Sequence, residues 1–342
     1  MEILSTSERD LEQAAAALAS GALVAFPTET VYGLGADAFN TSALARIFEV
    51  KNRPRFDPLI IHIADLASLS RIADTAALSE ASSKRLSVLS ERLWPGPLTL
   101  ILPKRAEVPG LATAGLATVA VRFPSHPVAQ KLIQLSTGAV AAPSANPFGC
   151  LSPTRASHVI RQLGEKVDYI IDGGRTQVGI ESTVLDISGE IPRLLRPGGT
   201  SRELIEALIG KVELSTGPSI EPYAETTDSA AAPMSPGQLK SHYAPTTPLI
   251  LHKAGKLASL PEAQGEGRLY FSTPAADPNP GVSRVIRVLS ETGDLCEAAA
   301  NLFDMLHELD RLGLCLIRAE EAPAHGLGAA INDRLRRAEG SA

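Results

Sequence analysis

The sequence is poor in cysteine and in aromatic residues. Its 342 residues include three cysteines, Cys150, Cys296 and Cys315, which form no CxxC pair. This odd number and wide spacing support neither a disulfide framework nor a structural zinc site, and they fit a reducing cytoplasm. Aromatic residues make up 4% of the chain, which is low for a protein that stacks nucleic-acid bases on its side chains.

Long apolar runs and an excess of positive charge are also lacking. No segment approaches the roughly 20 consecutive apolar residues of a membrane-spanning helix, and the N-terminus carries Glu2, Glu8 and Asp10 instead of basic residues. We therefore expect a cytoplasmic protein with no membrane contact. Lys and Arg number 32 against 38 Asp and Glu, so any RNA contact would need a local basic patch.

Familiar nucleotide and hydrolase motifs are missing as well. The chain has no GxxxxGK[ST] phosphate loop, no GxGxxG after its first expected strand, no HExxH and no GxSxG. The enzyme classes that depend on these motifs lose support, because each motif has a definite mechanical role. Any nucleotide must therefore bind in a less common way.

A regular alternation of extended and helical segments is present. Strands are expected at 22–26, 59–63, 98–102, 118–123, 139–142, 169–172, 183–187 and 193–196, and helices at 7–20, 42–50, 77–93, 127–136 and 153–163. This pattern predicts an α/β domain over residues 1–212. Residues 213–245 lack apolar periodicity and are interpreted as a linker or lid, and residues 246–342 predict a second, smaller α/β domain.

Cations near the ends of expected elements are candidates for chemistry. Lys51, Arg53 and Arg55 lie between a helix and a strand, where loops often line a site, although a solvated loop is the competing interpretation. Arg122 and Arg196 each follow apolar strand residues closely, and Arg196 directly precedes a proline. Arginine there suits bidentate capture of a carboxylate or phosphate, and an internal salt bridge is the alternative.

Polar residues follow two further elements. Ser144 and Asn146 come directly after a short apolar strand and offer hydroxyl and amide groups to a ligand. Ser152 is expected to cap a helix that has Pro153 at its first position, where free N–H groups favour a phosphate, but capping alone explains Ser152 about as well. His62 lies in an apolar strand, where a core histidine satisfied by the backbone is the commoner situation.

Several ordered blocks resemble one known family. They are FPTETVYGLG at 26–35, KNRP at 51–54, VRFP at 121–124, APSAN at 142–146 and LRPGG at 195–199. These blocks resemble the YrdC-like domain of threonylcarbamoyl-AMP synthases over nearly all of residues 10–210. SPG at 235–237, HYAP at 242–245 and AINDR at 330–334 resemble the linker and second domain of the long form of that family. The resemblance implies a twisted open sheet with flanking helices, followed by a smaller Rossmann-like α/β domain.

The resemblance also implies an activity and a site. The family makes threonylcarbamoyl-adenylate and pyrophosphate from L-threonine, bicarbonate and ATP, and the product passes to a tRNA threonylcarbamoyl transferase. Threonine would be bound by Thr30, His62, Arg122, Ala142 and Ser182. ATP would be bound by Lys51, Arg53, Asp57, Thr118, Ser144, Ser152, Arg196 and Tyr243, with Lys51, Arg53 and Arg122 as the catalytic residues. Magnesium is expected on the triphosphate without an identifiable protein ligand, and the sequence leaves open whether this chain makes a weak tRNA contact.

Two other interpretations remain open on the sequence. Hydrogenase-maturation carbamoyltransferases contain a similar domain, but they carry zinc-finger segments and this chain has too few cysteines. An RNA-binding or ribosome-assembly module with the same fold is the second, and the net negative charge counts against it. The synthase is favoured because a carbamate attacking the α-phosphate needs positioning and charge neutralisation but no covalent nucleophile.

Overall fold

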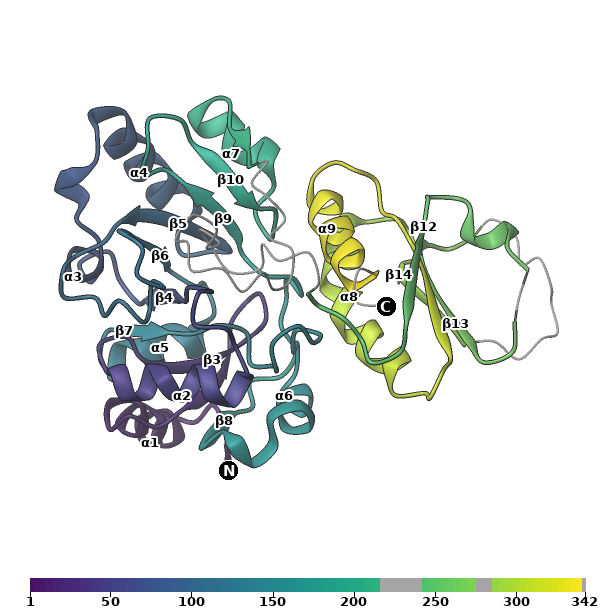
Figure 1. The fold of residues 1–342 in the computed structure, drawn as a ribbon, viewed down its shortest axis with the longest axis horizontal. Coiled ribbons are helices and arrows are strands. Elements are labelled where there is room, and N and C mark those ends of the chain that lie inside the picture. Colours follow the sequence, from purple (N-terminus) through teal and green to yellow (C-terminus); the bar gives the residue numbers. More distant parts are fainter. Residues whose placement is uncertain (216–241, 262, 275–284, 340–342) are drawn as a thin grey trace, which may run out of the picture.

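The computed structural model describes residues 1–215, 242–261, 263–274 and 285–339. In Figure 1 these residues form two α/β domains that lie side by side. The expected SPG block at 235–237 and most of the 213–245 segment lie outside the described residues. In the part of the chain that is described, no helix combines the length and apolar character needed to cross a membrane.

The larger domain is built on a mixed sheet. In the described residues it has 11 strands in the order β1-β8-β2-β3-β7-β4-β6-β5-β9-β10-β11. Their bounds are β1 (Glu2–Leu4), β2 (Val24–Pro27), β3 (Tyr32–Asp37), β4 (Ile60–Ile63), β5 (Leu98–Pro103), β6 (Thr118–Arg122), β7 (Ala139–Ala141), β8 (Tyr169–Ile171), β9 (Thr183–Asp186), β10 (Arg193–Arg196) and β11 (Glu213–Leu214). Parallel and antiparallel pairs both occur, and β4 pairs parallel to β6 but antiparallel to β7.

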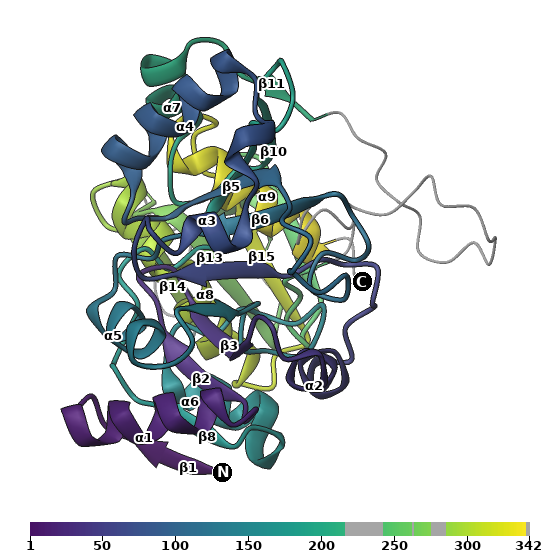
Figure 2. The same ribbon diagram turned by 90° about the vertical axis from the view of Figure 1, so that its left-hand side faces the viewer.

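Helices cover both faces of this sheet. Their bounds are α1 (Glu8–Ala19), α2 (Thr41–Lys51), α3 (Leu69–Ile72), α4 (Glu80–Leu93), α5 (Pro127–Leu135), α6 (Ala156–Leu163) and α7 (Arg202–Ile209). Figure 2 shows α1 and α5 together on one side of β2, with α2 on the other side. Alternation along β2 explains both contacts, because Phe26 packs with α1 and α5 while Ala25 belongs to the core beneath α2.

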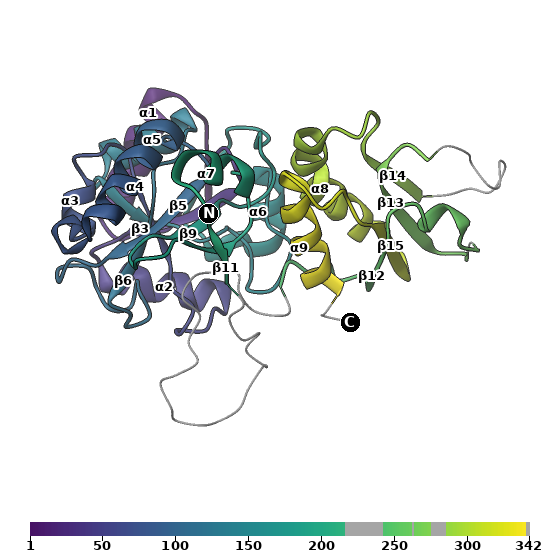
Figure 3. The ribbon, with the colours of Figure 1, turned by 90° about the horizontal axis from the view of Figure 1, so that it is seen from above.

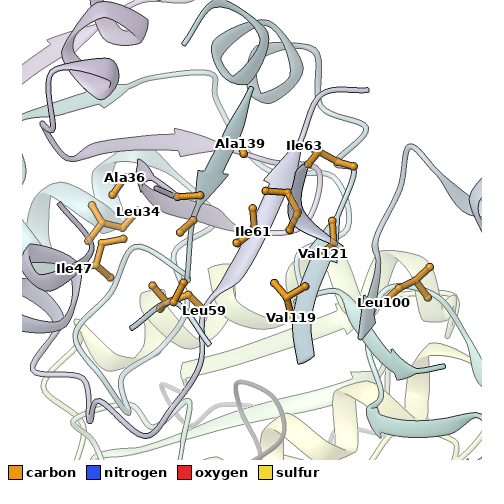
Figure 4. Close-up of a cluster of buried hydrophobic side chains, with 14 of the residues drawn as sticks. Leu34, Ala36, Ile47, Leu59, Ile61, Ile63, Leu100, Val119, Val121 and Ala139 are labelled. Carbon is orange, nitrogen blue, oxygen red and sulfur yellow. The ribbon is translucent and has the colours of Figure 1, made fainter. Parts of the chain in front are cut away.

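The same alternation places the site. Ile61 and Ile63 on β4 and Val119 and Val121 on β6 point into the main core (Figure 4). The intervening residues of the two strands therefore face the opposite side of the sheet. The parallel register sets His62 directly beside Arg122 on that side. Two polar side chains from segments 60 residues apart in sequence are thus brought together.

The smaller domain has a parallel sheet. Its described strands lie in the order β12 (Leu249–His252), β15 (Leu316–Glu320), β13 (Glu266–Ser272) and β14 (Val285–Ser290). Helices α8 (Leu295–Asp310) and α9 (Leu327–Glu339) lie between this sheet and the larger domain (Figure 3). The predicted α/β class, with an open sheet and a smaller α/β domain behind it, is confirmed.

One predicted helix start is wrong. Helix α6 begins at Ala156 with Arg155 as its N-cap, and no side chain caps it. Ser152 lies upstream of the helix, outside any helix or strand, and donates its hydroxyl to Glu181 instead. The Ser-Pro pair at 152–153 therefore does not place a phosphate at a helix N-terminus, because the free N–H groups of α6 begin later in the chain.

Candidate active site

A cavity opens on the sheet face that carries His62 and Arg122. Of the thirteen predicted site residues, nine line it: Thr30, Arg53, His62, Arg122, Ala142, Ser144, Ser182, Arg196 and Tyr243. The other four, Lys51, Asp57, Thr118 and Ser152, do not. Thr28, Glu181 and His242 also line the cavity, and none of them was assigned a binding role from the sequence. Three arginines thus converge on one cavity, an arrangement suited to an anionic ligand.

Arg122 has a buried anionic partner. Its Nη2 atom lies 2.8 Å from Oε1 of Glu29, and both side chains are about 5% exposed or less. The internal salt bridge considered from the sequence is therefore present, and Arg122 nevertheless lines the cavity. Neither carboxylate oxygen of Glu29 has a hydrogen bond within the described residues. The pair thus relies on charge attraction, and Arg122 retains hydrogen-bonding capacity for a ligand carboxylate.

His62 presents a neutral imidazole to the cavity. Burial, reinforced by the charge of Arg122, lowers the pKa of His62 to about 3. Its Nδ1 atom is buried and has no hydrogen-bond partner among the described residues. A neutral ring with an unused nitrogen can donate to or accept from a ligand without adding a charge.

Arg196 and Ser182 form a second polar wall. Nη2 of Arg196 donates to the Ser182 carbonyl oxygen at 2.9 Å and to its hydroxyl oxygen at 3.2 Å. The hydroxyl groups of Ser182 and Thr99 share a hydrogen bond of 2.8 Å. Gly198 makes this wall possible, because a Cβ atom there would lie 2.3 Å from the Ser182 carbonyl carbon.

Lys51 lies outside the cavity and supports one of the turns that line it. It ends α2, and its Nζ atom donates to the carbonyl oxygen of Ser144 at 2.6 Å and to that of Asn146. Burial, followed by the nearby charge of Arg53, lowers the pKa of Lys51 well below its ordinary value. Its ammonium group holds the turn that presents Ser144 to the cavity.

Arg53 reaches the cavity from the next turn of chain. Asn52 adopts a left-handed conformation with φ 51°, which ends α2 and redirects the chain. Nη2 of Arg53 donates to the Pro58 carbonyl oxygen at 2.8 Å and lies 2.9 Å from Oδ2 of Asp57. Asp57 therefore neutralises and orients Arg53 and does not itself line the cavity.

Side chains of the smaller domain also contact the residues that form the cavity wall. Glu181 accepts a hydrogen bond from Ser152 on one oxygen and from Nε of Arg334, at 2.8 Å, on the other. Arg334 belongs to α9, and its guanidinium carbon lies 5.1 Å from the ring centre of Tyr243. Tyr243 also packs against Phe303 of α8, with ring centres 5.7 Å apart.

Two family models together cover the chain. Residues 16–198 match the model described as "Telomere recombination", and residues 200–340 match "Threonylcarbamoyl-AMP synthase, C-terminal domain". The threonylcarbamoyl-AMP synthase of Bacillus subtilis is 41% identical, over 98% of this chain and 95% of its own. The chain belongs to the threonylcarbamoyl-AMP synthase family. The resemblance seen in the sequence is confirmed, and it extends to the long two-domain form.

A second relative and a solved structure are similar to this chain over the same length. The enzyme of Pyrococcus abyssi is 42% identical, over 96% of this chain and 93% of its own. The crystal structure of P. abyssi Sua5 complexed with L-threonine superposes with a TM-score of 0.86, at 39% identity, covering 99% of this chain and 98% of that one. Both domains and their relative placement are therefore shared with that structure.

Sequence reasoning missed the partners of the site residues. Glu29 lies in the FPTET block and Arg334 in the AINDR block, both of which carried the resemblance to threonylcarbamoyl-AMP synthases. Glu181 directly precedes Ser182, which the resemblance placed in the threonine site. The signal was present, but only the tertiary structure shows which buried acid meets which arginine.

Proposed function

We propose that the chain forms threonylcarbamoyl-AMP and pyrophosphate from L-threonine, bicarbonate and ATP, as an L-threonylcarbamoyladenylate synthase. The observation that carries the proposal is the convergence of Arg53, Arg122 and Arg196 on one cavity, in a chain closely similar to an enzyme crystallised with L-threonine. The full-length similarity to synthases favours this activity over an RNA-binding module.

We propose that threonine occupies the side of the cavity between β4 and β6. Arg122 would bind its carboxylate, which would share or replace the attraction of Glu29 for the guanidinium. Neutral His62 and Thr30 would supply uncharged hydrogen bonds, while Ala142 would contribute backbone and Ser182 a hydroxyl. Selectivity for threonine over serine depends on one methyl group and is limited to about 10- to 200-fold.

The nucleotide would bind against the other cations. Arg53, Arg196, Ser144 and Tyr243 line the cavity and are proposed to contact ATP. Lys51, Asp57 and Ser152 would act through these residues, because each bonds to the cavity wall from outside it. Thr118 begins β6 at the opposite end from Arg122. An ATP contact there requires the nucleotide to extend along the sheet beyond the cavity.

The chemistry follows from charge and position. The threonine amine and bicarbonate form a carbamate with loss of water, and a carbamate oxygen then attacks the α-phosphorus as its bond to pyrophosphate breaks. Buried arginines would neutralise the developing charge in a site of low dielectric, and no covalent nucleophile takes part. Tyr243, which is 1% exposed, would keep water from the reactive mixed anhydride.

Magnesium and the later partners complete the proposal. Magnesium would enter as the MgATP substrate, and no protein ligand is proposed, since no group of three or more His, Cys, Asp or Glu in the described residues could hold a metal ion. A tRNA threonylcarbamoyl transferase in the cytoplasm would consume the product, with at most a weak tRNA contact to this chain.

Pyrophosphate release tests the proposed function. The full chain is incubated with MgATP and bicarbonate, with and without L-threonine, and the product is identified by mass spectrometry. Threonine-dependent release with threonylcarbamoyl-AMP as product is expected. Release that ignores threonine, or tRNA binding in a gel shift with no release at all, would overturn the proposal.

A further inference from the structure

One side chain of the smaller domain ends at the cavity wall of the larger one. Arg334 has a side chain that is 0% exposed, although it belongs to an interdomain helix. Its Nη1 atom donates to the Pro197 carbonyl oxygen at 2.7 Å, and its Nε atom donates to Glu181 at 2.8 Å. Its guanidinium lies beside the ring of Tyr243. Two of these three partners line the cavity.

We propose that Arg334 is a positioning residue for the adenylate-forming reaction, through which the second domain holds Glu181 and Tyr243 against the cavity. This inference rests on the proposed function and gives the second domain a chemical task within it. Arg334 contacts no reacting atom and acts only through its two neighbours.

The geometry of the guanidinium supports this task. A buried charge is costly unless it is paired and hydrogen-bonded, and Arg334 finds an anionic partner in Glu181 across the interface as well as Asp333 on its own helix, at 2.8 Å. The planar fork bonds to Glu181 and Pro197 in a fixed, bidentate geometry, which the rotating ammonium group of lysine does not reproduce. The second carboxylate oxygen of Glu181 accepts the hydrogen bond from Ser152, so the position of Arg334 also affects that of Ser152.

Tyr243 requires support from outside its own segment. Its backbone φ of 65° is left-handed, which is unfavourable for a bulky residue and persists only when the surroundings hold it. Arg334 of α9 and Phe303 of α8 contact the Tyr243 ring and provide these surroundings. A cation over a desolvated tyrosine ring is attractive, so removing Arg334 frees the ring that closes the cavity.

The interface offers a matched control. Arg155 on the larger domain donates to Asp304 of α8 with distances of 2.8 and 2.9 Å, so it also links the two domains. Arg155 does not line the cavity and contacts neither Glu181 nor Tyr243. Its loss weakens docking of the domains without disturbing the cavity wall.

Kinetics of two full-length variants test the inference. Arg334→Gln is expected to lower kcat/KM for ATP by about 10- to 100-fold, because small misplacements of binding groups carry penalties of that size. It should also lower the yield of threonylcarbamoyl-AMP per pyrophosphate released, since the freed ring admits water. Arg155→Gln is expected to stay within about threefold of the wild type in both measurements.

A second pair of measurements separates positioning from stability. In a Tyr243→Ala background Arg334→Gln should cause little further loss of product yield, because that loss is attributed to the ring and residues that act together give non-additive changes. Wild-type kinetics and yield in Arg334→Gln, or an equal loss in Arg155→Gln, would overturn the inference. If Arg334→Gln does not fold, Arg334→Lys decides, and a wild-type yield there would overturn it as well. Failure of the wild type to release pyrophosphate would count against the proposed function alone.

Discussion

Glu29 Oε1 lies 2.8 Å from Arg122 Nη2, and the two side chains form a buried ion pair at the edge of the cavity. Arg122 therefore has its charge compensated before any ligand arrives. Since neither carboxylate oxygen of Glu29 has a hydrogen bond within the described residues, the buried charge of Glu29 depends on Arg122 for compensation. Stability and carboxylate recognition are thus joined in one contact, and substitutions can separate them.

Arg122→Met is expected to lose threonine binding and stability together. Charge-assisted hydrogen bonds contribute about 1.5–3 kcal/mol, so threonine affinity should fall by about 10- to 150-fold in calorimetric titration. Breaking one side of a buried pair leaves the other charge uncompensated and costs about 3–5 kcal/mol.

The double variant R122M/E29Q is the matched control for this prediction. It carries no unpaired charge at the site, so most of the lost stability should return in thermal unfolding. Threonine binding should remain weak. Recovery of binding in the double variant would show that Arg122 does not recognise the carboxylate.

Local sequence patterns predicted the individual elements well. Strand β4, expected at 59–63, runs over Ile60–Ile63, and β6, expected at 118–123, runs over Thr118–Arg122. Both are short runs rich in β-branched apolar residues, a pattern that indicates a buried strand. Strand β3 was missed, because YGLGAD has low strand propensity. A Cβ atom at Gly35 would lie 2.8 Å from the ring of Phe26, so packing there requires glycine.

Contacts between distant residues were not predictable in the same way. The resemblance identified Arg122 and Ser152, but their partners Glu29 and Glu181 are 93 and 29 positions away in sequence. Pairing over such distances depends on the strand order, which a single sequence does not contain. The prediction of where α6 begins was wrong for this reason, because the hydroxyl of Ser152 bonds to a distant partner and caps no helix.

Gly198→Ala should damage the cavity wall. Its Cβ would lie 2.3 to 2.4 Å from backbone atoms of Glu181, Ser182 and Thr183, and backbone cannot move aside cheaply. We expect a displaced Ser182, a fall in pyrophosphate release of about tenfold or more, and a lower melting temperature. Gly110→Ala is the control, because nothing lies within 4 Å of a Cβ there. Equal behaviour of the two variants would contradict the prediction.

Lys51→Met should weaken ATP binding although Lys51 does not line the cavity. Its ammonium holds the carbonyl groups of Ser144 and Asn146, so its loss releases the turn that presents Ser144 to the cavity. If one nucleotide contact of about 1.5 kcal/mol is lost with that turn, affinity falls by about tenfold. Equilibrium binding of an unreactive ATP analogue measures the effect.

The control for Lys51 is a partly exposed surface lysine. Lys131→Met removes only a surface pair with Glu8, at 3.7 Å, and such pairs contribute little. It should bind the analogue like the wild type. Lys51→Arg should not rescue binding, because the site is 1% exposed and the larger, planar guanidinium does not reproduce the two bonds of the ammonium group. Full rescue by arginine would indicate that charge alone matters there.

As the pH falls toward 5, His62 should lower the stability of the folded protein. The affinity for threonine should not change over this range. Burial lowers the pKa of His62 to about 3 from an ordinary value of 6.5. Below pH 6.5 the unfolded chain binds a proton at this residue that the folded chain does not, so stability is full above 6.5 and declines as the pH falls toward 3. One proton corresponds to about 1.4 kcal/mol per pH unit.

Two variants separate these effects. His62→Gln should flatten the stability curve between about pH 7 and pH 5 in denaturant unfolding, relative to the wild type, and should weaken threonine binding at every pH. His307→Gln should flatten it too, because burial lowers the pKa of His307 to about 4. His307 stacks on His158 and bonds to the Ser152 carbonyl oxygen at 3.1 Å, but it does not line the cavity, so its loss should leave threonine binding intact. Wild-type threonine affinity should stay level over this range. An inflection near pH 6.5 that disappears in His62→Gln would mean that His62 is charged in the folded protein, which its burial beside Arg122 opposes.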